Sequence, residues 1–316
     1  MPLPPSLDGR LRLPVVAAPM FLCSGPELVV ACCRAGVLGT FPALNQRSTE
    51  GFEDWLNAVE SQVGPADAPF GVNLIVHRSN ERLDADLQVV VRHQVPVVIT
   101  SLGAVPDVVE AVHSYGGVVF HDVTTRRHAE KAAEAGVDGL ILVCAGAGGH
   151  AGTLSPFALL PEVREVFDGT ILLAGGLSSG AQVAAALAMG ADLAYMGTRF
   201  LATQECQASD AYKAMLTEAR AADIVYTPAL SGVPANYLRQ SILAAGLDLD
   251  SLSAKDKAAL NLDPAKRVWR DIWSAGQGVG AIADVPTTAA LIDRLEQEYL
   301  ATLDRMVLLA QGFEET

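Results

Sequence analysis

The sequence predicts an α/β fold, a TIM (β/α)8 barrel with a smaller, mostly helical cap subdomain inserted after the last barrel strand. Between residues 13 and 200, short aliphatic runs alternate with segments of helical period, and the alternation supplies eight strands. Aliphatic runs of this length that end at glycine are typical of parallel strands buried on both faces. Eight strands in strict alternation favour a closed barrel over an open sheet. No G-x-G-x-x-G motif follows the first strand, which argues against a dinucleotide-binding fold.

Local patterns justify the barrel elements in turn. Pro26 and Glu27 favour a helix start after the first strand, because proline suits the first helical position and an acidic residue suits the first turn. Gly190 stands where a glycine ends the Ala- and Leu-rich helix predicted at 178–189. The predicted strands are 13–18, 37–41, 70–76, 96–100, 118–121, 138–143, 171–173 and 193–196.

The alternation stops after Phe200. An amphipathic helix is predicted at 205–221, residues 227–241 show little periodicity, and 251–266 are polar and charged. The expected organisation has three parts, which are a barrel over 1–204, a cap over 205–275, and a glycine-rich turn with a C-terminal helix over 276–316. We expect the cap to close the barrel mouth and exclude water.

Composition limits the partners. The 22 basic and 36 acidic residues give a formal charge of −14, so no nucleic acid or anionic membrane is expected as a partner. The five cysteines form no C-x-x-C pair and are odd in number, which favours reduced thiols. No signal-peptide pattern and no apolar run near the roughly 20 residues of a membrane helix is evident, so we expect a cytoplasmic protein. The six histidines show no metal-ligand spacing, and we expect no metal.

Two glycine turns predict a phosphate site. Gly175-Gly176 follow the seventh strand and Gly197-Thr198 follow the eighth. The loops after these strands commonly hold phosphate in a TIM barrel, and glycine lets an anion approach the backbone N–H groups. His150 lies one strand earlier, on the same face, in the loop A-G-A-G-G-H-A-G. This loop offers no apolar face for packing, so we assign His150 a role as a base or substrate hydrogen-bond donor.

Two other polar residues, Asn73 and Asp122, each allow a structural and a functional interpretation. Asn73, inside an apolar strand, is either a satisfied structural amide or a cofactor contact. Asp122 is either an acid–base group or a helix cap. His121 could face the mouth but is the weaker candidate, and Cys144 is expected to be a small packing residue because nothing adjacent would lower its pKa. His128 falls on a predicted surface helix and needs no role.

Six motifs, in order along the chain, together resemble one family. They are A-A-P-M at 17–20, G-V-N at 71–73, A-G-G-H at 147–150, G-G-L at 175–177, M-G-T-R-F at 196–200 and G-Q-G-V-G at 276–280. The set resembles the FMN-dependent nitronate monooxygenases, also called 2-nitropropane dioxygenase-like proteins. The resemblance implies FMN at the barrel mouth and a catalytic role for His150. The FMN-binding residues that it implies are Ala18, Pro19, Met20, Asn73, Asp122, Ala147, Gly148, Gly149, Gly175, Gly176, Gly197, Thr198 and Gln277.

The resemblance further implies oxidation of small nitronates or nitroalkanes, with dioxygen reoxidising the flavin. His150 would bond the nitro oxygens or remove the α-proton. The chain departs from many members at 144–149 and at His121-Asp122, and both departures concern the substrate side. The alternatives are an NAD(P)H-dependent flavin reductase of quinones or enoyl-ACP and, more remotely, a non-catalytic flavin- or phosphosugar-binding barrel. A monomer and a homodimer both remain open.

Overall fold

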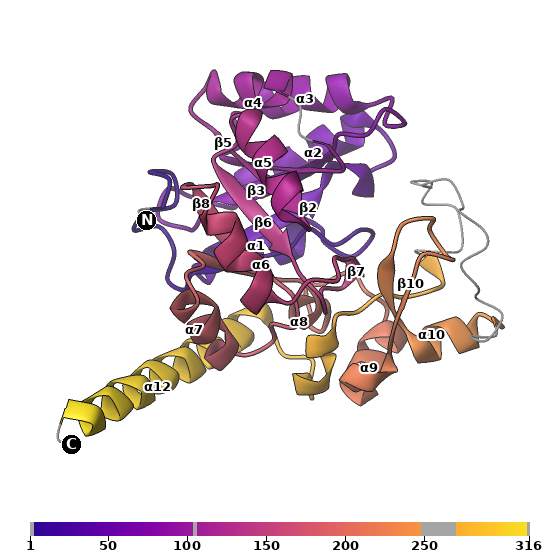
Figure 1. The fold of residues 1–316 in the computed structure, drawn as a ribbon. Helices are drawn as coiled ribbons and strands as arrows, with labels where there is room; N and C mark the ends of the chain where they lie inside the picture. The colour runs from indigo at the N-terminus through magenta and orange to yellow at the C-terminus, as the bar shows by residue number, and fades with distance from the viewer. Residues whose placement is uncertain (1–2, 104–105, 248–269, 315–316) are drawn as a thin grey trace.

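Eight parallel strands form a closed barrel, which confirms the predicted fold (Figure 1). The computed structural model describes residues 3–103, 106–247 and 270–314. The last strand pairs with the first, Val15 opposite Ala194, so the sheet has no free edge. The barrel order is β1 (Val15–Ala17), β2 (Leu38–Pro42), β3 (Phe70–Ile75), β4 (Val97–Ser101), β5 (Val118–Val123), β6 (Gly139–Val143), β8 (Thr170–Ala174) and β9 (Leu193–Met196).

The barrel interior changes from apolar to polar toward the mouth. Ile99, Phe120 and Leu193 belong to one buried apolar cluster. Successive side chains of a strand point to opposite faces, so the residues two positions further along β4, β5 and β9 share this inward side. Those residues are Ser101, Asp122 and Tyr195, and all three line a cavity. The barrel interior is therefore filled by apolar side chains, and a polar layer, here called the polar floor, separates them from the cavity.

Helices surround the barrel and bury a second apolar layer against the outer faces of the strands. The first helix starts at Pro26 with Glu27 in its first turn, as predicted. Side-chain N-caps begin three of the helices around the barrel, from Ser48, Thr125 and Ser179, and Ser179 also forms a capping box with Gln182. The helices are α1 (Pro26–Arg34), α2 (Thr49–Glu60), α3 (Leu83–Arg92), α4 (Pro106–His113), α5 (Arg126–Glu134), α6 (Pro156–Arg164) and α7 (Gly180–Ala188).

The segment after the barrel contains strands that the sequence analysis did not predict. β10 (Ile224–Thr227) and β11 (Ala235–Leu238) form an antiparallel sheet with β7 (Gly149–His150), which lies in the loop after β6. The three-part division of the chain stays a prediction, and the polar stretch 251–266 lies outside the described residues. The helices of this segment are α8 (Thr198–Leu201), α9 (Asp210–Glu218) and α10 (Arg239–Ala244).

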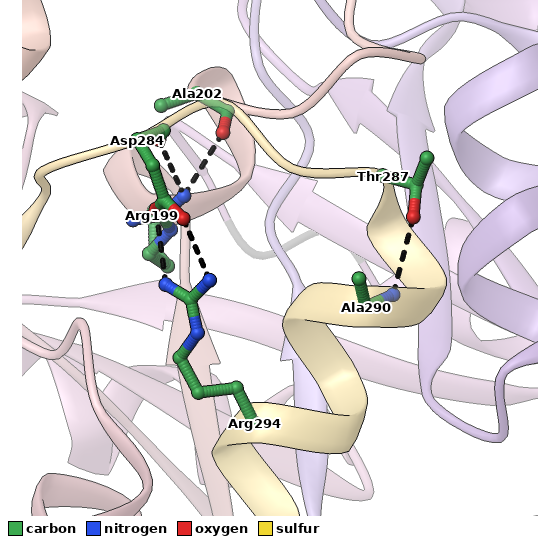
Figure 2. A network of polar contacts seen from close by, with 6 residues as sticks. All are labelled: Arg199, Ala202, Asp284, Thr287, Ala290 and Arg294. Atoms are coloured by element: carbon green, nitrogen blue, oxygen red, sulfur yellow. Dashed lines mark hydrogen bonds and ion pairs between the residues drawn. The ribbon is translucent and has the colours of Figure 1, made fainter.

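A long C-terminal helix, α12 (Thr288–Glu314), packs its first half against α7 and projects away from the barrel in Figure 1. Its start is tied to α8 through Asp284, whose carboxylate pairs with Arg294 at 2.6 Å and with the buried Arg199 at 3.5 Å (Figure 2). Arg199 also donates to the backbone oxygens of Ala202 and Asp284. Among the described residues, no helix is long and apolar enough to span a bilayer.

Candidate active site

A cavity of about 800 Å³ lies at the C-terminal ends of the barrel strands. This end of a TIM barrel is where active sites form, and the volume falls in the range of small-molecule sites. Thirteen of the fourteen residues proposed above as catalytic or FMN-binding line it, and Gln277 is the exception. Segments far apart in the sequence therefore meet at one cavity.

The two glycine turns form one wall. Gly176 has φ +74°, and a Cβ built on it would meet nothing within 4 Å, so the residue faces open cavity space. Its backbone N–H and that of Gly197 donate no hydrogen bond to another described residue. The first N–H groups of α8 also have no intrahelical partner. Backbone amides without an acceptor among the described residues, around this glycine cradle, fit a phosphate group.

A hydrogen-bonded chain of three polar side chains forms the floor. Asn73 Nδ2 donates to Ser101 Oγ at 2.8 Å, and Ser101 Oγ donates to Asp122 Oδ2 at 2.5 Å. Burial raises the pKa of Asp122 from its ordinary 3.8 to about 6, against the hydrogen bond from Ser101, which lowers it. Thr125, not Asp122, caps α5, so the cap interpretation of Asp122 is wrong. Asn73 has both features that were weighed, because it lines the cavity and also bonds the Ile99 carbonyl at 3.2 Å.

His150 lies in the glycine loop, and β11 holds this loop. Its backbone pairs with Ala235 of β11, and Gly149 pairs with Asn236. Asn236 Nδ2 donates to the Ala147 carbonyl at 2.7 Å. Burial lowers the pKa of His150, so the imidazole is neutral at neutral pH, as a general base must be.

The glycine-rich turn near 276 also contacts the glycine loop that carries His150. The Gln277 N–H donates to the Gly146 carbonyl at 2.8 Å, and the Gly276 N–H donates to Thr198 Oγ1 at 2.9 Å. A Cβ at Gly148 would stand 2.9 Å from the Gly276 nitrogen, so only glycine fits there. The backbone hydrogen bond from Gln277 to Gly146 places the exposed Gln277 side chain beside Gly146. The Gln277 side chain does not line the cavity.

Among the cavity residues that sequence reasoning missed are Ser101, Tyr195, His128 and Lys131. Ser101 and Tyr195 sit at strand ends, and their inward register was the available signal. His128 was predicted to be a surface residue of a helix, and Lys131 was not considered. Both also line the cavity. Their spacing of three places both on one face of α5.

The cysteines lie in the protein interior. All five are free and buried, and burial raises the pKa of Cys144 to about 12. Such a thiol stays protonated and is a poor nucleophile. No group of three or more metal-ligating side chains comes together within the described segments.

The model of the nitronate monooxygenase family matches residues 80–298. The chain belongs to this family. A nitronate monooxygenase of Paraburkholderia phytofirmans is 25% identical, over 93% of this chain and 94% of that protein. The (3aS,4S,5R,7aS)-5-hydroxy-7a-methyl-1-oxo-octahydro-1H-indene-4-carboxyl-CoA dehydrogenase of Rhodococcus jostii is 29% identical, over 96% of this chain and 82% of that protein. The solved nitroalkane oxidase of Streptomyces ansochromogenes superposes with a TM-score of 0.78 at 26% identity, over 95% of this chain and 99% of that one.

Membership in the family defines the enzyme class. The protein is a flavin-dependent oxidoreductase. The site geometry agrees, because a neutral histidine, a polar floor and a free amide cradle face the same cavity at the mouth of the barrel.

Proposed function

We propose that the chain binds FMN without a covalent link and oxidises small nitronates and nitroalkanes, with dioxygen as the final electron acceptor. The observation that carries the proposal is the arrangement of His150 and the glycine cradle around one cavity. FMN, when bound, supplies the two-electron redox chemistry that no side chain offers. The protein positions the substrate and moves protons.

The phosphate would sit on the amides of Gly175, Gly176, Gly197 and Thr198. At the other side of the mouth, Ala18, Pro19 and Met20 line the cavity and give a mostly apolar surface for a flavin ring. Both hydrogen bonds of the Asn73 side chain use Nδ2, so its Oδ1 is available to accept from a ring N–H. The Gln277 side chain is not needed in this arrangement.

His150 would act on the substrate. A neutral imidazole can remove the α-proton of a nitroalkane, and the same ring can bond the oxygens of a nitronate, which has already lost that proton. The remaining glycine-loop residues, Ala147, Gly148 and Gly149, hold the histidine at the cavity and leave room for the ligand. Closure of the cap over the mouth would exclude water.

The first test concerns the cofactor. Gly176→Asp places a carboxylate in the proposed phosphate cradle, and the expected result is folded protein that has lost its flavin absorbance. Gly116→Asp is the matched control, because Gly116 has φ +84°, open space at Cβ and no contact with the cavity. A yellow Gly176→Asp variant would place the phosphate elsewhere.

The second test concerns His150. His150→Asn should lower kcat/KM for a neutral nitroalkane by a factor on the order of 10² or more, because the proton must be removed. The loss for the matching nitronate should be smaller, and the FMN content should not change. Equal losses for both substrates would remove the general-base role.

A second candidate rests on the Rhodococcus jostii relative, which covers 96% of this chain and is named a carboxyl-CoA dehydrogenase. In that case the flavin would oxidise a CoA ester in the same cavity. The NAD(P)H-dependent reductases stay rivals as well. Anaerobic reduction of the bound flavin by a nitronate, by a hydroxyacyl-CoA or by NAD(P)H separates the three.

A further inference from the structure

One part of the cavity wall gathers basic side chains, of which Lys131 carries the charge, because burial lowers the pKa of His121 to about 4. Among the described residues that line the cavity, Asp122 is the single carboxylate, whereas three histidines and Lys131 are basic. The whole chain carries 36 acidic and 22 basic residues. His121, Thr124, His128 and Lys131 form this part, here called the basic wall, at the end of β5 and the start of α5.

Both histidines of the basic wall are held in the same way. His121 Nδ1 bonds Thr100 Oγ1 at 2.7 Å, and His128 Nδ1 bonds Thr124 Oγ1 at 3.0 Å. Neither Nε2 has a hydrogen bond to another described residue, and His121 is only 6% exposed. Where the threonine hydroxyl donates to Nδ1, Nε2 carries the proton and becomes a donor. Each ring is therefore oriented to present Nε2 to a ligand.

Lys131 completes the wall. It follows His128 by three residues on α5, so the two lie on one helix face. Its ammonium group forms no ion pair with another described residue. Arg126, at the start of the same helix, is by contrast paired with Glu130 and Glu165. A lysine without an ion pair among the described residues, beside two rings that present Nε2, forms a site for an anion.

This anion is not the flavin phosphate of the proposed function. The glycine cradle lies at the ends of β8 and β9, whereas the basic wall lies at β5 and α5. We propose that the basic wall binds an anionic group of the substrate, a carboxylate or a phosphate, that is separate from the group that reacts. This proposal rests on the proposed function, because it takes the same cavity as the flavin and substrate site.

The test measures binding to the flavin-loaded full chain by calorimetry, so it does not depend on turnover. One arm compares 3-nitropropanoate with 1-nitropropane, which lacks the carboxylate. The other arm compares 4′-phosphopantetheine with pantetheine, which lacks only the phosphate. At least one anionic probe should bind on the order of tenfold tighter than its neutral match. The arm that shows the preference identifies the source of the anion.

Lys131→Glu should abolish that preference, because it reverses the charge at an exposed position. Arg127→Glu is the matched control on the same helix, since Arg127 is exposed and does not line the cavity. No preference in either arm, or equal losses in both variants, would overturn the proposal. Loss of flavin in Lys131→Glu would overturn it too, by making the wall the phosphate site. Failure of nitronate turnover with an intact preference would instead count against the proposed function alone.

Discussion

Asp122→Asn should stabilise the folded protein at alkaline pH and have little effect at pH 4. The carboxyl group has a pKa of about 6 in the folded state against 3.8 ordinarily, because burial disfavours its charged form. Between pH 4 and 6 the folded state therefore holds a proton that the unfolded state has released, and stability falls as pH rises through this window. Above pH 6 the charge is present in both states, and a shift of about 2 units corresponds to about 3 kcal/mol of destabilisation.

The asparagine removes this charge but keeps the shape of the side chain. Its Oδ1 can still accept the hydrogen bond that Ser101 donates to Asp122. Urea unfolding of the flavin-free protein should show a gain of up to about 3 kcal/mol at pH 8 and almost none at pH 4. Asp168→Asn is the control, because this carboxylate is exposed to water. A gain of equal size at both pH values, or a loss at pH 8, would refute the reasoning.

Two further predictions concern the scaffold. Ser179→Ala removes the N-cap and the capping box of α7 and should lower the free energy of unfolding by about 1 kcal/mol, read from urea unfolding; an unchanged midpoint would contradict the cap. Phe41→Ala empties a fully buried site between Phe52 and Trp55, whose rings meet Phe41 edge-on, and should cost about 3–5 kcal/mol, read as a lower Tm. A loss below about 1 kcal/mol would mean that the neighbouring rings collapse into the space.

The barrel was predictable because burial on both faces leaves a strong mark on the sequence. A parallel strand between core and helices needs an unbroken aliphatic run, and the run at 171–173 extends by one residue on each side to give β8. The glycine turns and His150 were found for a related reason. Gly175 and Gly176 have positive φ, which favours glycine, so the residue type itself indicates the backbone conformation.

The cap sheet was not predictable from local pattern. β7 is only two residues long, and its partner β11 lies far along the chain. Such a pairing gives no alternation of apolar and polar residues that a sequence window could detect. The basic wall was missed for a similar reason, because His121 lies in β5 whereas His128 lies on the following helix, and only the fold brings the two rings to one cavity. The position of Gln277 was set by its backbone N–H bond to Gly146, which no side-chain pattern encodes.

The pairing of β7 with β11 ties the position of His150 to the cap, and Asn236 tests that connection. Its side chain is 3% exposed and donates to the Ala147 carbonyl at 2.7 Å, three residues before the histidine. Asn236→Ala leaves this carbonyl without its donor and should cost about 1–3 kcal/mol of stability. It should also lower kcat/KM for a nitroalkane while the flavin stays bound, because the proposed phosphate cradle lies on other loops. Asn80→Ala is the matched control, since Asn80 Nδ2 makes the same kind of bond, to the Ile75 carbonyl at 2.9 Å, away from the His150 loop. If both variants lose stability and catalysis in the same proportion, β11 does not position His150. If only Asn236→Ala loses catalysis beyond its loss of stability, β11 holds the histidine in place.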